Sequence, residues 1–170
     1  MTFPYVELHT HSNFSLKEGA SHIHELTTQA QKLGYPALGL TDHNTLAGAM
    51  LFTQTAHSLG IQPILGSEIT LSNGHHLTLI VRTQKGYENL SHLLSMAHIS
   101  SDRKNPLLSP KSIPDFAEGL TLLTGCRKGE ISTFLAKGHE SRALHAVTQY
   151  LDWFGSKNVY IEMQQNYVYG

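Results

Sequence analysis

The sequence predicts an α/β fold made of βα units around a largely parallel sheet or barrel. Short apolar runs alternate along the chain with stretches of about 10 to 15 residues whose apolar side chains recur at helical spacing. No internal repeat, low-complexity tract or obvious linker interrupts this alternation. Because 170 residues are enough to bury one hydrophobic core, we expect a single domain over residues 1–170.

The first half of the chain gives the clearest alternation. Ser21 can cap a helix that Gly34 ends, and Gly60 ends the next helical stretch. Strands are predicted at residues 5–9, 37–41 and 62–71, and helices at residues 21–33 and 45–59.

The second half begins with a predicted hairpin. Asn73-Gly74 is typical of a tight turn between two antiparallel strands. Three prolines in residues 99–114 predict a loop with at most a short helical turn. Strands are predicted at residues 76–82, 120–124 and 159–163, and helices at residues 87–98 and 141–154.

Composition excludes several classes of protein. The formal net charge of −1 argues against a strongly basic nucleic-acid-binding face. No apolar stretch is long enough to cross a membrane, and the first residues lack the pattern of a signal peptide. The single cysteine, Cys126, cannot form an internal disulfide, which favours the reducing cytoplasm. Histidine is the outlier, with twelve residues.

Potential metal ligands stand at five successive strand ends. Parallel βα architectures place their active sites at the carboxyl ends of strands, so these side chains should converge. Imidazole, carboxylate and thiolate together make the ligand set of a multinuclear metal site. Histidines on the predicted helices are interpreted as ordinary surface or partly buried residues. The strand-end residues are His9, His11, Asp42, His43, Glu68, His76 and Cys126.

Each type of ligand has a distinct expected role. His9 and His11 are two residues apart on a strand and should face the same side. Glu68 can bridge two cations, and Asp42 is a candidate acceptor that fixes the tautomer of an imidazole. Glu18, on the loop after His11, is close enough in the chain to reach the same ions. Of the adjacent pair His75 and His76, strand alternation favours His76.

Other chemistry is poorly represented. The chain has no P-loop, no dinucleotide-binding glycine motif and no nucleophile elbow. Cys126 is a possible nucleophile, but its surroundings fit a metal ligand equally well. Arg127 and Lys128 are expected to lower the pKa of that thiol, and they are also candidates to bind a phosphate.

Six segments together resemble the PHP (polymerase and histidinol phosphatase) domain. Their order is most similar to the N-terminal PHP domain of bacterial C-family DNA polymerases, particularly the error-prone alpha-subunit type. The similarity covers essentially the whole chain. The segments are VELHTHSNFSLKEGA, ALGLTDHNTLAGA, PILGSEITL, HHLTLIVRTQKGYENLSHLLS, GLTLLTGCRKGEI and VYIEMQQNYVYG.

The resemblance implies a distorted (β/α)7 barrel with two or three divalent cations (zinc, manganese or iron) at one edge. It also implies that a final Asp-x-His ligand pair and the closing strands follow Gly170. Polymerase PHP domains commonly have aspartate where this chain has Glu18. The implied metal ligands are His9, His11, Glu18, His43, Glu68, His76 and Cys126.

The implied function is metal-dependent phosphoester hydrolysis within a polymerase that serves DNA replication and repair. Its substrate would be a DNA 3′ end or a related phosphoester, as in 3′–5′ exonuclease proofreading, and its partner would be the rest of the polymerase chain. Glu68 and Asp42 are the residues assigned to catalysis. Two alternatives stay open: a small-molecule phosphatase of the histidinol-phosphatase branch, and a metal-stabilised scaffold of the polymerase without turnover.

Overall fold

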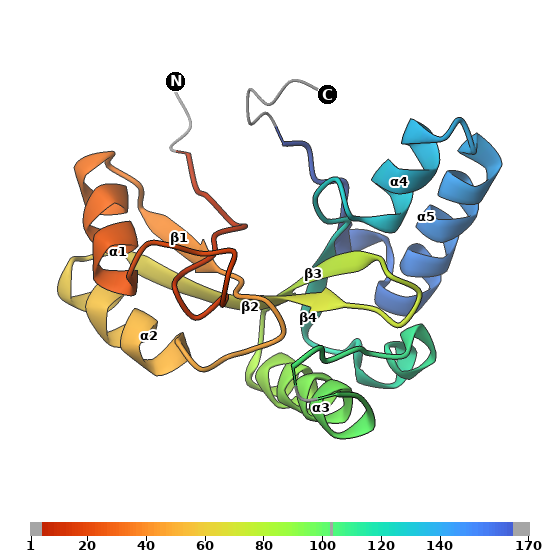
Figure 1. The fold of residues 1–170 in the computed structure, drawn as a ribbon. Coiled ribbons are helices and arrows are strands. Elements are labelled where there is room, and N and C mark those ends of the chain that lie inside the picture. The colour runs from red at the N-terminus through yellow and green to blue at the C-terminus, as the bar shows by residue number, and fades with distance from the viewer. Residues whose placement is uncertain (1–4, 103, 165–170) are drawn as a thin grey trace.

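The fold is seen in a computed structural model that describes residues 5–102 and 104–164 (Figure 1). It has the mixed α/β architecture that the sequence predicts. No described helix is long and apolar enough to span a membrane. The helices are α1 (Ile23–Lys32), α2 (Ala49–Ser58), α3 (Gln84–Ser100), α4 (Glu130–Ala136) and α5 (Glu140–Phe154), with 3₁₀ turns at Pro110–Ser112, Pro114–Phe116 and Ser156–Asn158. The strands are β1 (Ala37–Leu40), β2 (Gln62–Thr70), β3 (His76–Val81), β4 (Leu120–Leu123) and β5 (Val159–Tyr160).

The sheet has the order β1-β2-β3-β4-β5 and is mixed, so the expectation of a largely parallel sheet is wrong. Strand β1 pairs with β2, and β4 with β5, in parallel, whereas β3 is antiparallel to both neighbours. The chain after α3 returns to the end where β3 stops, since Val81 pairs with Leu120, and this makes β4 antiparallel.

The predicted hairpin between β2 and β3 is confirmed, with a loop one residue longer than a two-residue turn. Leu71 N donates to the carbonyl oxygen of His75 at 2.8 Å, which leaves three residues in the loop. Gly74 lies at φ 85°, a left-handed conformation that glycine adopts without a steric cost. This turn fixes the register in which His76 enters the sheet beside β2.

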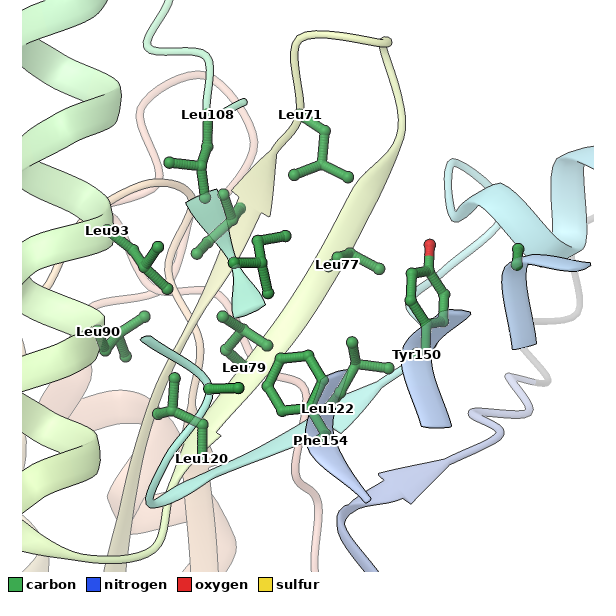
Figure 2. Packing of buried hydrophobic residues seen from close by; sticks show 14 of the residues in the cluster. Leu71, Leu77, Leu79, Leu90, Leu93, Leu108, Leu120, Leu122, Tyr150 and Phe154 are labelled. Atoms are coloured by element: carbon green, nitrogen blue, oxygen red, sulfur yellow. The ribbon is translucent and has the colours of Figure 1, made fainter. Parts of the chain in front are cut away.

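Two hydrophobic clusters support the sheet. The smaller one lies between α1, α2, β1 and the start of β2, around Phe52 and Ile23. The larger one packs α3 and α5 against β2, β3 and β4, and its leucines interleave with Tyr150 and Phe154 (Figure 2). The side chains of Leu77, Leu79 and Leu122 are completely buried there. The two clusters hold opposite ends of the long strand β2 (Figure 1).

The first extended segment is less regular than predicted. Residues 5–9 make only one isolated bridge, between Glu7 and Leu38, and form no continuous strand. Two backbone hydrogen bonds hold the segment beside β1: Gly39 N donates to the Glu7 oxygen at 2.7 Å, and Thr41 N donates to the Thr10 oxygen at 2.9 Å. The segment therefore runs parallel to β1 and delivers two histidines to the end of that strand.

Several predicted boundaries shift for local reasons. Helix α1 begins after His22, whose backbone N–H donates to the Glu25 carboxylate at 2.7 Å, rather than after Ser21. Helix α2 begins only at Ala49, because residues 45–48 form a turn. Helix α3 starts earlier, capped by the Thr83 hydroxyl, and it extends into the segment predicted as a loop.

Helix α4 was not predicted at all. Its seven residues lie between Gly129 and Gly138 and are too few to show helical periodicity. The last strand, predicted over residues 159–163, is limited to β5, and residues 165–170 of the final motif lie outside the described part of the chain.

Candidate metal centre

The strand ends converge on Glu68. This residue lies in β2 next to the chain that follows β1, since His43 and Glu68 form a parallel bridge. His76 is the first residue of the neighbouring strand β3, and its backbone pairs with Thr70. Thr70 lies two positions after Glu68 in β2, so the two residues are on the same side of the sheet. Only 1% of Glu68 is exposed, so its carboxylate must find its partners within the protein.

Four imidazoles surround that carboxylate. Oε2 of Glu68 lies 2.8 Å from Nε2 of His9 and 3.0 Å from Nε2 of His11. Nε2 of His43 is 3.6 Å from the same oxygen, and Nδ1 of His76 is 2.6 Å from Oε1. Burial alone raises the pKa of Glu68, but hydrogen bonds from the imidazoles outweigh burial and hold the pKa far below its usual range. Glu68 is therefore a carboxylate.

The side chains form two candidate ligand groups that share Glu68. One contains His9 and His11, and the other contains His43 and His76. Within each group the candidate ligand atoms lie within 4.8 Å of one another. Neutral imidazoles with a carboxylate suit zinc, manganese or iron, and a carboxylate common to two groups can bridge two cations. The donor set therefore fits divalent metal ions.

The ring of His43 shows how crowded the imidazoles are. It stacks on His11 with ring centroids 4.4 Å apart and an interplanar angle of 5°. Burial, together with the nearby His11 and His76, lowers the pKa of His43, although Glu68 and Glu18 act in the opposite direction. A lowered pKa keeps an imidazole neutral, which is the form that binds a metal.

The predicted residues of the 126–128 loop reach the site unequally. Sγ of Cys126 lies 3.6 Å from Oε1 of Glu68. Lys128 lines the cleft and its Nζ lies 3.2 Å from Oε1 of Glu18, whose other oxygen contacts Nε2 of His43. Arg127 is exposed and does not line the cleft. The expectation that Arg127 and Lys128 lower the pKa of the Cys126 thiol is wrong, because burial raises that pKa.

Asp42 is buried but contacts no imidazole in the described part of the chain. Its Oδ1 accepts hydrogen bonds from Ser12 N at 2.7 Å and from the Ser15 hydroxyl at 2.6 Å. Its Oδ2 accepts from the Ser12 hydroxyl at 2.7 Å. Asp42 therefore anchors the loop that follows His11.

Glu162 is a site residue that the sequence interpretation missed. Its Oε1 lies 2.6 Å from Nδ1 of His9, on the opposite side of the ring from Glu68. Burial alone lowers the pKa of His9, but hydrogen bonds to Glu162 and Glu68 outweigh it and raise the pKa to about 9. The available signal was position, because Glu162 follows the apolar pair of β5 at one more strand end.

The candidate metal ligands open into a cleft of about 860 Å³. One wall is the first extended segment, with Tyr5 and Val6, and the opposite wall is the chain at Tyr160 and Ile161. Residues near both described ends of the chain thus line the cleft, and Figure 1 shows these two ends on the same side of the sheet. The lining combines these polar side chains with apolar ones such as Ile64, Ile80 and Leu123.

The chain is similar in sequence to known proteins. Residues 7–166 match the family described as PHP domain. An error-prone DNA polymerase of Symbiobacterium thermophilum is 38% identical over 94% of this chain and 16% of its own length. The DNA polymerase III subunit alpha of Saccharopolyspora erythraea is 30% identical over 96% of this chain and 16% of its own length. The chain thus spans about one sixth of these relatives.

A solved structure, assigned as a metal-dependent phosphoesterase from Bifidobacterium adolescentis, superposes with a TM-score of 0.47 and 21% identity. The match covers 97% of this chain and 58% of that one. The family match extends over nearly the whole sequence, and the polymerase relatives align over almost all of it. The chain therefore belongs to the PHP domain family.

Proposed function

We propose that this chain is the PHP domain of a bacterial C-family DNA polymerase and that it hydrolyses phosphoesters with two or three divalent cations. The observation that carries the proposal is the shared carboxylate of Glu68, which lies between two groups of imidazoles. The polymerase relatives, 30% and 38% identical, support the setting in a longer cytoplasmic polymerase chain.

Each group of candidate ligands would hold one cation of the hydrolytic site. Cations in such a site lower the pKa of a bound water and neutralise charge on a phosphate. His9, His11 and Glu68 would hold one ion, while His43 and His76 would hold the other, with Glu68 shared between the two groups. Cys126 and Glu18 lie at the edge of this group and would complete the coordination.

The cleft supports a phosphoester substrate that enters beside Lys128. The Lys128 side chain is 56% exposed and its ammonium group is paired only with Glu18 in the described residues, so it is available to a phosphate oxygen. Arg127 lies outside the cleft, which makes it the weaker candidate. A DNA 3′ end is the substrate that the polymerase setting favours.

The first test is metal content. Chain purified without chelator should contain at least one equivalent of zinc, manganese or iron by elemental analysis. The double substitution His9→Ala and His11→Ala should remove one ion, because it deletes both imidazoles of one group. Substoichiometric metal that the double substitution leaves unchanged would contradict the site.

The second test is hydrolysis of a chromogenic phosphodiester and of single-stranded DNA from its 3′ end. Activity should require metal and should collapse in Glu68→Gln, which preserves the shape of the side chain but removes its charge. Metal binding without turnover would assign the site to a scaffold instead.

The third test is a longer chain. We propose that residues after Gly170 supply closing strands and further ligands, so an extended chain should gain metal content and activity together. Equal activity of the 170-residue chain and the extended chain would refute this part of the proposal.

A further inference from the structure

Ser15 lies between a buried carboxylate and a candidate metal ligand. Its side chain is nearly inaccessible, with 1% exposed, and Asp42 beside it is 2% exposed. The Ser15 hydroxyl is 2.6 Å from Oδ1 of Asp42 and 3.4 Å from Nδ1 of His11. The backbone N–H of His43 also donates to this hydroxyl oxygen, at 3.0 Å. One small group therefore contacts two segments that carry metal ligands.

Counting donors and acceptors fixes the direction of these hydrogen bonds. A carboxylate only accepts, and the same Oδ1 of Asp42 already faces a fixed donor, Ser12 N, at 2.7 Å. The single hydroxyl proton of Ser15 must then point at Asp42. The Ser15 oxygen can only accept from its other neighbours, which are His43 N and the Nδ1 atom of His11. His11 must consequently carry a proton on Nδ1.

We propose that Ser15 is a positioning residue that holds His11 in the Nδ1–H tautomer, with Asp42 setting its orientation. In the metal-loaded chain this tautomer leaves the lone pair of Nε2 for the cation, and Nε2 lies 3.0 Å from Oε2 of Glu68, the carboxylate that would share that ion. The inference rests on the metal site proposed above, and it assigns to the Asp42–Ser15 pair the orientation of one of its ligands.

The neighbouring ligand, His9, is oriented in a corresponding way. Its Nδ1 faces Oε1 of Glu162 at 2.6 Å, and its Nε2 faces Oε2 of Glu68 at 2.8 Å. The two imidazoles thus present the same ring atom to the same carboxylate oxygen. Their outward nitrogens are held by unrelated parts of the chain, the loop after His11 and the segment after β5.

The chain offers a matched pair of variants. Ser12 and Ser15 are both buried, lie on the same loop and each donate a hydroxyl hydrogen bond to Asp42. Only the Ser15 hydroxyl also lies within hydrogen-bonding distance of an imidazole. Ser15→Ala therefore removes the contact with His11, and Ser12→Ala removes an equivalent contact with Asp42 without touching His11. Each variant also removes one hydrogen bond from a backbone N–H, that of His43 to Ser15 and that of Phe14 to Ser12.

The measurement is the ring ¹⁵N spectrum of His11 in the labelled, zinc-loaded chain, together with the zinc affinity of each variant. We expect the wild-type spectrum to show a proton on Nδ1 and zinc on Nε2. Ser15→Ala should weaken zinc binding by about ten-fold, the lower end of the effect of losing such an outer contact. Ser12→Ala should keep the wild-type His11 signals and nearly the wild-type affinity.

A third variant tests the direction of the hydrogen bonds. In Asp42→Asn the amide oxygen must still face Ser12 N, so it can still accept from Ser15, and the Nδ1–H tautomer should persist. Zinc on Nδ1 of His11, or equal losses of affinity in Ser15→Ala and Ser12→Ala, would overturn the role of Ser15 while leaving the metal site intact. Failure of the wild-type chain to bind zinc would instead overturn both.

Discussion

The floor and the outer edge of the candidate metal cleft both pair a carboxylate with basic side chains, but in opposite surroundings. The floor consists of His9, Glu68 and His76, whose side chains are 5%, 2% and 11% exposed. The outer edge consists of Glu18 and Lys128, whose side chains are 46% and 56% exposed. Charges interact strongly where water is excluded and weakly where it screens them. The floor should therefore dominate both stability and metal binding.

Metal removal should produce the largest effect. Clustered ligands gain their partner when a cation binds the folded chain, so saturating zinc at about a thousand times its Kd should add about 4 kcal/mol of stability. A chelator should lower the melting temperature accordingly, as measured by circular dichroism. The double substitution His9→Ala and His11→Ala should strongly reduce this response, whereas Lys128→Ala should retain it. A melting temperature that chelator does not change would contradict a metal-bound site.

Loss of the central charge should come next. Glu68→Gln leaves the imidazoles of the floor without their anion, and breaking a buried charged pair costs on the order of 3 kcal/mol. Urea unfolding of the metal-free variant and the metal-free wild type would measure the difference. A variant as stable as the wild type would mean that the carboxylate contributes only through the metal.

The stability of the metal-free chain should also decrease at both acid and alkaline pH. The pKa of His9 rises from 6.5 to about 9 on folding, so its contribution is complete below pH 6.5 and is lost as pH rises through about 9. The pKa of Glu68 falls from 4.5, so its contribution is present above pH 4.5 and is lost as pH decreases below that value. Stability from these two groups should therefore be greatest between pH 4.5 and 6.5.

Thermal unfolding of the metal-free chain between pH 4 and pH 10 would test this window. Glu162→Gln is the specific control, because it removes the negative charge that faces His9. It should reduce the loss of stability at alkaline pH and leave the loss at acid pH unchanged. A profile whose alkaline side is unchanged in that variant would remove Glu162 from the explanation.

The smallest effect should come from the outer edge. Lys128→Ala removes an exposed ion pair with Glu18, and such pairs contribute about 0.2 to 1 kcal/mol, less at high salt. The same unfolding experiment at low and high salt would measure it. A loss as large as that of Glu68→Gln would show that floor and edge are not different environments.

The sequence by itself determined the elements and the composition of the floor. The apolar runs located all five strands and the hairpin, because burial and strand alternation act over a few neighbouring residues. Metal-ligand residue types at strand ends, such as His9 and Glu68, could be recognised in the sequence. They were expected to lie close together because the ends of paired strands are neighbours. The sequence did not reveal the short helix α4 or the irregular form of the first segment. Seven residues are too few to show helical periodicity, and a single bridge produces no recognisable sequence pattern.

Only the tertiary structure decided how these side chains are held. Glu162 reaches His9 from 153 residues away, and Ser15 reaches Asp42 across 27 residues. Nothing local in the sequence relates these partners. Arg127 and Lys128 are adjacent in the chain, yet only Lys128 lines the cleft. The pKa of Cys126 rises because burial outweighs the hydrogen bond from the backbone of Lys128. Burial, distance and hydrogen-bond direction are properties of the packed chain, and they decide which histidine nitrogen is free to bind a metal.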